Sequence, residues 1–241
     1  MNRTALIYEK GEGILFHEVS KYFKQKKIEV ITHTEFTLYQ PQVDIVIDLD
    51  SGFTTNKRKW LSLIEQEMGA DIPIFSSAHY YSATEMASWL IHPTRLVGFS
   101  PIAIQDRNIL EVSRPLQAKG IKNEDEKYAL WQTLGKTVEE VADEPGLVFP
   151  RTIAMLVNEA VFAWREQVAS QTEIDIAMKK GTNFPFGPFE WADQIGIASI
   201  VAILSGLYRE FGEERYRPAP YLKKMFYANA HFDVDKEERS C

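Results

Sequence analysis

Residues 181–191 read GTNFPFGPFEW and interrupt a half of the chain that otherwise has the periodicity of amphipathic helices. Gly181 is suited to ending a helix, because glycine adopts a left-handed conformation without strain. Gly187 and Pro188 are suited to starting the next helix, and Glu190 would place a negative charge in its first turn. The stretch therefore predicts two helices joined at a corner, with its aromatic side chains anchored in the core or in an interface.

Helical periodicity continues on both sides of this corner, from about Asn123 onward. An apolar stripe recurs at helical spacing over residues 153–168. The segment SQTE at residues 170–173 is typical of a capping box that opens a further helix. Strand-like runs fade in this part of the chain. Residues 116–241 are therefore predicted to form an all-α domain.

Residues 1–115 follow a different pattern. Short apolar, β-branched runs alternate with amphipathic stretches, as in βαβ units that feed a parallel sheet. The predicted strands are Ala5–Tyr8, Ile28–Thr32, Val43–Leu49, Ile72–Ser76 and Arg95–Phe99. The predicted fold class is thus an α/β N-terminal domain with a reduced parallel sheet, followed by a helical C-terminal domain.

Composition limits the class of partner. The chain has 241 residues, with 34 acidic and 27 basic side chains and a net charge of -7. This balance disfavours nucleic acid and anionic membrane surfaces as partners. The only cysteine is Cys241, so we expect neither an internal disulfide nor a cysteine metal site. No apolar run approaches the roughly 20 residues of a membrane span, and no signal peptide is evident. We therefore expect a cytoplasmic protein that binds no nucleic acid, membrane or metal.

A glycine pair follows the first predicted strand. The segment LIYEKGEGILF supplies Gly11 and Gly13, at the place where a dinucleotide-binding unit brings backbone amides to a pyrophosphate. Phe16 occupies the position of the third glycine, and Glu9 adds negative charge beside any phosphate. No acidic residue ends the second strand, where one would bind a ribose. The segment is interpreted either as a dinucleotide site or as a plain turn.

From about residue 72 to residue 200 the chain resembles the 3-hydroxyacyl-CoA dehydrogenase family. The segments that carry the resemblance, in order, are IPIFSSAHYYSATEMA, RLVGFSP, NILEVSRP, LGKTVEEVADEPGLVFPR, LVNEAV and EIDIAMKKGTNFPFGPFEWADQIG. The resemblance implies a Rossmann-like N-terminal domain, NAD as cofactor, an acyl-CoA substrate and a helical domain that forms a homodimer. Residues 1–71 agree only in pattern. The connection between the second and third strands is shorter than in the family, which implies a degenerate NAD-binding domain.

The resemblance also implies a reaction and its residues. In the family, NAD takes a hydride from C3 of a 3-hydroxyacyl-CoA while a histidine, held by a glutamate, removes the hydroxyl proton. Glu111 matches the glutamate. The histidine position falls in the segment RLVGFSP, where this chain reads Phe99, Ser100, Pro101, and the position of a substrate-binding asparagine is Pro150. Proline has neither an amide side chain nor a backbone N–H.

Two residues near the fourth strand are further candidates. Ser77 is matched to the family's serine-containing loop, and His79 lies on the loop at the carboxyl edge of the sheet. His79 is either a relocated base that pairs with Glu111 or a packing residue. Asp48 and Asp50 are either ligand contacts or the start of the following helix.

Asn158 fits an inter-helix hydrogen bond better than catalysis. Two functions therefore remain for the chain as a whole. One is an NAD-dependent dehydrogenase of acyl-CoA metabolism with rearranged or impaired catalytic groups. The other is a non-catalytic descendant that keeps the dimeric scaffold and an acyl-CoA cleft.

Overall fold

The computed structural model describes residues 3–9, 13–53, 56–120 and 124–232. The chain divides into two compact units, residues 1–148 and 149–241. The sequence placed this division after residue 115. The segment 116–148 belongs with the first unit because it contains a strand that pairs with the sheet, β7.

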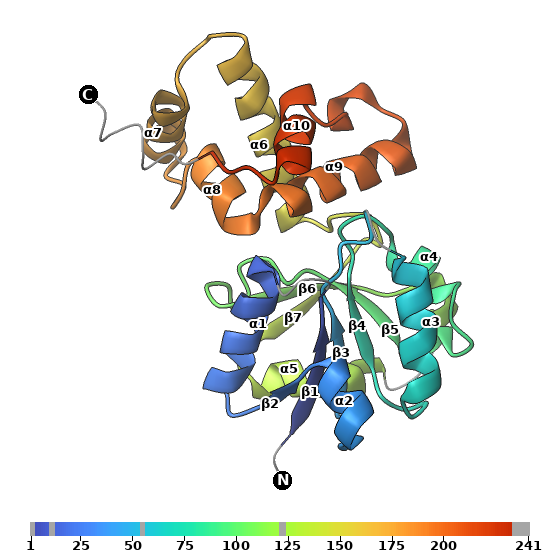
Figure 1. The fold of residues 1–241 in the computed structure, drawn as a ribbon. Helices are drawn as coiled ribbons and strands as arrows, with labels where there is room; N and C mark the ends of the chain where they lie inside the picture. The colour runs from blue at the N-terminus through green and yellow to red at the C-terminus, as the bar shows by residue number, and fades with distance from the viewer. Residues whose placement is uncertain (1–2, 10–12, 54–55, 121–123, 233–241) are drawn as a thin grey trace. The chain divides into compact units, whose positions relative to one another are not determined.

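The first unit is built on a seven-stranded sheet with the order β2-β1-β3-β4-β5-β6-β7 (Figure 1). The strands are β1 Thr4–Tyr8, β2 Glu29–Ile31, β3 Ile45–Asp48, β4 Ile74–Ser77, β5 Leu96–Phe99, β6 Ile109–Ser113 and β7 Thr137–Val141. All neighbouring pairs are parallel except β5 and β6. The first five match the predicted strands. The sequence missed β6 and β7, and β7 in particular carries acidic side chains on an exposed edge, where burial imposes no apolar pattern.

Helices cover both faces of this sheet. They are α1 Ile14–Gln25, α2 His33–Tyr39, α3 Lys57–Glu67, α4 Ala83–Ala87 and α5 Ala129–Thr133, with short 3-10 turns η1 Pro93–Arg95, η2 Leu116–Ala118 and η3 Glu124–Tyr128. The α3 and α4 helices bury Trp60 and Met86 in a cluster with Leu6 and Val46 of the strands. On the opposite face, Trp131 of α5 contacts the rings of both Phe23 and Phe75, at 5.2 and 5.6 Å between centroids. Figure 1 shows α1 and α3 on opposite sides of the sheet.

The strand order fixes where a ligand would bind. The chain leaves β1 toward β2 on one side and returns to β3 on the other, so the carboxyl ends of β1 and β3 flank a topological switch point. Glu9 follows β1 and Asp48 ends β3 at this edge. In open α/β sheets this crevice is the usual ligand position.

The second unit is helical, as predicted. Its elements are α6 Phe149–Arg165, α7 Gln171–Thr182, α8 Pro188–Ile195, α9 Ile197–Phe211, η4 Glu214–Tyr216 and α10 Pro220–Ala228. The capping box at Ser170 and Glu173 opens α7 as the sequence predicts. Among the described residues no single helix is long and apolar enough to cross a membrane; only α8 and α9 together reach that length and composition, and they are bent by 99°.

The corner at residues 181–191 is held by a buried carboxylate. Asp175 of α7 accepts hydrogen bonds from the backbone N–H of Phe189 at 2.9 Å and of Glu190 at 3.1 Å, so it caps the start of α8. Gly187 is the N-cap residue of α8, and a Cβ there would lie 2.2 Å from the Asp175 carboxyl carbon. The predicted start of the helix is confirmed. The predicted end of α7 is wrong: Gly181 lies inside the helix, and Asn183 takes the left-handed position with φ of 56°.

Candidate functional site

The site is built from the residues at the carboxyl edge of β1, β3 and β4. These strands bring together Glu9, which follows β1, Asp48 at the end of β3 and Ser77 at the end of β4. The neighbouring loops add Asp50 and His79. Of the two predicted glycines, Gly13 precedes α1 as its N-cap residue, and Gly11 lies outside the described residues.

The Glu9 carboxylate occupies the start of α1. Its Oε2 accepts the backbone N–H of Phe16 at 2.7 Å, and a second backbone hydrogen bond comes from Gly13. A Cβ on Gly13 would lie 3.0 Å from the other carboxylate oxygen, so the space that this glycine leaves open is filled by Glu9. Burial raises the pKa of Glu9 to about 7, and the charges of Asp50 and Asp48 add to this rise, while the two backbone bonds oppose it.

These contacts bear on the predicted NAD site. A dinucleotide needs the amides at the first turn of α1 to receive its pyrophosphate. One of those amides, that of Phe16, donates to the Glu9 carboxylate, which also lies where the phosphate oxygens would approach Gly13. The sequence predicted two obstacles, the bulk of Phe16 and the charge of Glu9, and the structure shows that the Glu9 carboxyl group contacts the first turn of α1 directly. Among the described residues, which exclude residues 10–12, the Glu9 carboxyl group thus takes the place that a dinucleotide pyrophosphate would need at the start of α1.

A buried ion pair closes the adjacent part of the edge. Lys57 Nζ lies 2.7 Å from Asp48 Oδ2, and neither side chain is exposed. Ser76 donates its hydroxyl to the same oxygen at 2.6 Å, and Lys57 also donates to the backbone carbonyl of Asp50. Burial raises the pKa of Asp48, and the charge of Lys57 opposes this rise. Asp48 is thus committed to internal contacts, while Asn56 is the N-cap residue that starts α3.

Ser77 and His79 are buried without hydrogen-bond partners among the described residues. The Ser77 hydroxyl and both ring nitrogens of His79 lack a partner, and His79 is only 1% exposed. Burial lowers the pKa of His79 to about 3, and the nearby charge of Lys57 lowers it further. His79 is therefore neutral at physiological pH. Because its nitrogens have no partner, the structure does not form the predicted pair between His79 and Glu111.

Glu111 on β6 is instead bound by other groups. Its Oε1 lies 2.9 Å from an Arg107 guanidinium nitrogen, and its Oε2 accepts the Val148 backbone N–H at 3.1 Å. The backbone N–H of Ser100 donates to the Glu111 carbonyl at 3.3 Å, so the position of the family's histidine does lie opposite this glutamate. The Ser100 hydroxyl accepts the N–H of Ile102. The paired positions are thus close, but the side chains are directed to other partners.

In the second unit the candidate residues are structural. Pro150 is buried in the first turn of α6. Asn158 of α6 donates to the Arg217 carbonyl at 3.0 Å and accepts the Ala219 N–H at 2.8 Å, which fixes the segment before α10 against α6. The sequence predicted an inter-helix hydrogen bond for Asn158; the structure shows hydrogen bonds to the segment that precedes α10.

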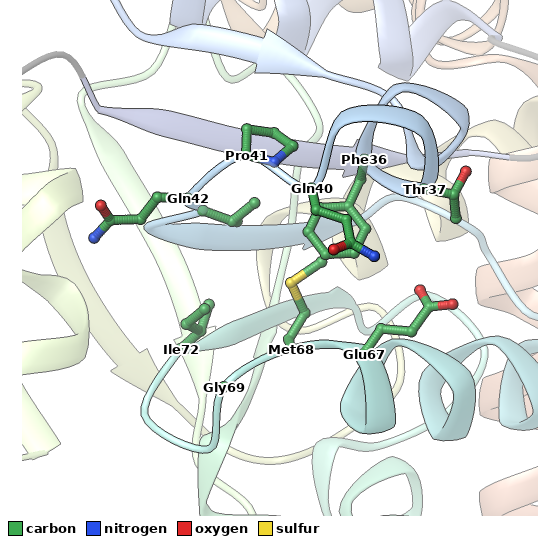
Figure 2. Close-up of a pocket in the computed structure, with 10 residues that line it drawn as sticks. Phe36, Thr37, Gln40, Pro41, Gln42, Glu67, Met68, Gly69 and Ile72 are labelled. Carbon is green, nitrogen blue, oxygen red and sulfur yellow. The ribbon is translucent and has the colours of Figure 1, made fainter.

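A separate pocket of about 540 Å³ lies at the opposite, amino-terminal edge of β3 and β4 (Figure 2). Phe36 and Met68 form its apolar wall, and the Gln40 amide and the Glu67 carboxylate lie at its rim. Glu67 already contacts His33 Nε2 at 2.8 Å. The walls come from segments that are distant in the sequence, so no local motif predicts this pocket.

Comparisons with known proteins agree with this fold. Residues 146–236 match the family model described as the C-terminal domain of 3-hydroxyacyl-CoA dehydrogenase. The chain is 31% identical over 215 residues to a 3-hydroxybutyryl-CoA dehydrogenase from Clostridioides difficile, a match that covers 87% of this chain and 75% of that protein. It is 32% identical over 184 residues to a probable 3-hydroxybutyryl-CoA dehydrogenase from Bacillus subtilis, which covers 75% and 63% of the two chains.

A solved structure of a related dehydrogenase has a similar fold. The crystal structure of (S)-3-hydroxybutyryl-CoA dehydrogenase from Ralstonia eutropha superposes with a TM-score of 0.69 at 26% identity, over 95% of each chain. The Rossmann-like unit, the helical unit and their order in the chain all agree with such dehydrogenases. The chain therefore belongs to the 3-hydroxyacyl-CoA dehydrogenase family.

Proposed function

We propose that this protein is a member of the family that has lost NAD-dependent oxidation of 3-hydroxyacyl-CoA and keeps the fold as an acyl-CoA-binding, dimeric module. The observation that carries this proposal is the state of Glu111. In the family a glutamate orients a catalytic histidine, whereas here the Glu111 carboxylate binds Arg107 and the Val148 amide. Ser100 stands at the histidine position, and a serine hydroxyl cannot accept the substrate proton at neutral pH.

The candidate replacement base does not restore the chemistry. A general base works best when its pKa lies near the operating pH. The pKa of His79 falls to about 3, and its ring is 1% exposed, so it is both too weak a base and shielded from a substrate hydroxyl. The start of α1 adds an obstacle to NAD binding, because the Glu9 carboxyl group there accepts a hydrogen bond from the Phe16 backbone N–H.

The test separates binding from turnover. NADH and acetoacetyl-CoA are first titrated separately into the purified protein with thermal stability as the readout, and are then mixed with it together while NADH absorbance is followed. We expect acetoacetyl-CoA alone to stabilise the protein, by about 2.7 kcal/mol at 100 times its dissociation constant. The Clostridioides difficile relative serves as the active control. NADH oxidation by this protein at a rate near that of the control would refute the proposal.

We also propose that the second unit forms a homodimer and that the protein acts in the cytoplasm. Large apolar side chains are exposed on this unit at Val168, Ile176, Phe184 and Tyr227. Exposed apolar groups of this kind support an interface between copies. Sedimentation equilibrium tests the dimer, and replacing Ile176 and Val168 by Glu is expected to yield monomers. A monomeric wild type at micromolar concentration contradicts the proposal.

A further inference from the structure

We propose that Glu9 is an internal occupant of the phosphate site at the start of α1 and keeps dinucleotides from binding there. This inference rests on the proposed loss of NAD chemistry and names its physical cause. It concerns one side chain, so it makes a different prediction from the loss of the catalytic histidine. A helix start that is occupied by one carboxyl group can be vacated by one substitution.

The geometry supports this assignment directly. The N-terminus of a helix offers unpaired N–H groups and a partial positive charge, which together attract an anion. In α1 this place is taken by the Glu9 carboxyl group, of which one oxygen accepts the Phe16 N–H at 2.7 Å and the other lies 3.0 Å from where a Cβ on Gly13 would be. The first turn of α1 itself contains no acidic residue, so the charge is supplied by the chain before the helix. A phosphate at this position would have to displace Glu9.

The surroundings add to the barrier. Burial raises the pKa of Glu9, and the charges of Asp50 and Asp48 near the end of β3 raise it further. Both carboxyl groups therefore disfavour a further negative charge. Lys57 neutralises Asp48 through the buried ion pair and is also bound to the Asp50 carbonyl, so its charge is already committed. Burial raises the pKa of Tyr8, the last residue of β1, and the charges of Asp50 and Asp48 raise it further. Within the described part of this edge, which omits residues 10–12, a pyrophosphate would therefore meet the carboxyl groups of Glu9, Asp48 and Asp50.

A carboxylate also caps the helix that follows the neighbouring strand, β2. Thr32, which follows β2, donates both its backbone N–H and its hydroxyl to Glu35, at 2.7 and 2.9 Å. In a dinucleotide site this strand end presents an acidic side chain to the ribose. Here the carboxylate of Glu35 is directed back to the start of α2 as part of a capping box. The carboxylate of Glu35 is thus used in a helix cap, where it accepts hydrogen bonds from Thr32.

The experiment compares three full-length variants with the wild type. Glu9→Ala removes the occupant, and Glu9→Gln keeps its volume while removing its charge. Glu173→Ala is the matched control, because the Glu173 carboxylate also caps a helix N-terminus, but in the second unit. NADH binding is measured by calorimetry, with inorganic pyrophosphate as a competitor, and folding is checked by thermal unfolding.

The expected result is NADH binding by Glu9→Ala that is at least tenfold tighter than by the wild type and is reversed by pyrophosphate. If Glu9→Ala does not unfold cooperatively, Glu9→Gln carries the test, with an expected gain of at least threefold. Equal NADH affinity in the wild type and the Glu9 variants, or the same gain in Glu173→Ala, overturns the inference. Neither result restores catalysis, so the proposed function would stand; it falls only if the wild type oxidises NADH with acetoacetyl-CoA.

Discussion

Replacing Gly187 by alanine should destabilise the second unit strongly, whereas replacing Gly181 should not. A Cβ at residue 187 would lie 2.2 Å from the Asp175 carboxyl carbon, far inside van der Waals contact. Relief of this overlap must move Asp175 away from the N–H groups of Phe189 and Glu190. Hydrogen bonds to a charged acceptor contribute about 1.5–3 kcal/mol each, so we expect a loss of roughly 3–5 kcal/mol.

Gly181 provides the matched control. Nothing lies within 4 Å of a Cβ at this position, which is inside α7. Alanine there should stabilise the helix by about 0.5–1 kcal/mol, because glycine loses more backbone entropy on folding. Differential scanning calorimetry of the full chain can resolve the transition of the second unit. A change of less than about 1 kcal/mol for Gly187→Ala, or a loss for Gly181→Ala, would show that the account of this corner is incorrect.

Three further predictions concern the buried charges and the second unit. The pKa of Glu9 is raised from 4.5 to about 7 in the folded state, so the folded protein holds a proton that the unfolded chain releases, and stability should fall as pH rises between these values. The full shift corresponds to at most about 3 kcal/mol of unfolding free energy, and partial exposure reduces this to roughly 2 kcal/mol. Urea titrations at pH 5 and pH 8 should show this difference in stability. If the difference persists in Glu9→Gln, the assignment to Glu9 is wrong. Lys57→Met leaves Asp48 buried without its cation and should lower the unfolding free energy by about 3–5 kcal/mol. Urea unfolding at pH 7 measures this loss. A loss below about 1 kcal/mol would contradict the stabilising role of the ion pair. Asn158→Leu leaves the Ala219 N–H and the Arg217 carbonyl without their partner, so we expect the unfolding free energy to fall by about 2–4 kcal/mol. Calorimetry measures this loss. An unchanged unfolding transition would mean that water replaces the amide.

The local pattern was sufficient for those elements whose burial is uniform. The strands β1, β3, β4 and β5 carry apolar runs that are almost wholly buried, and the alternation of such runs with amphipathic stretches predicts the parallel sheet. The capping box of α7 and the start of α8 were also predicted, because their determinants lie within four residues of each other. The edge strand β7 was missed, since a strand that is mostly exposed needs no apolar alternation.

The candidate site could be predicted only in part. The sequence located Glu111 and Ser100, and it identified Glu9 as an unfavourable charge near a phosphate. It could not show that Glu9 receives the Phe16 amide, because that contact depends on how β1 enters α1. It also could not assign Arg107 as the partner of Glu111 or detect the buried pair of Lys57 and Asp48. Such contacts require the positions of separate segments.

The sequence by itself determined the family and the order of the two units, because long motifs and hydrophobic periodicity are local properties of the chain. Tertiary structure decided which side chains occupy the crevice. Asp175 lies 14 residues before Phe189 in the chain and still caps its helix, and Lys57 reaches Asp48 from the next helix. Buried polar groups must find partners wherever the fold supplies them, so their pairing is set by the packed strands and helices rather than by sequence spacing.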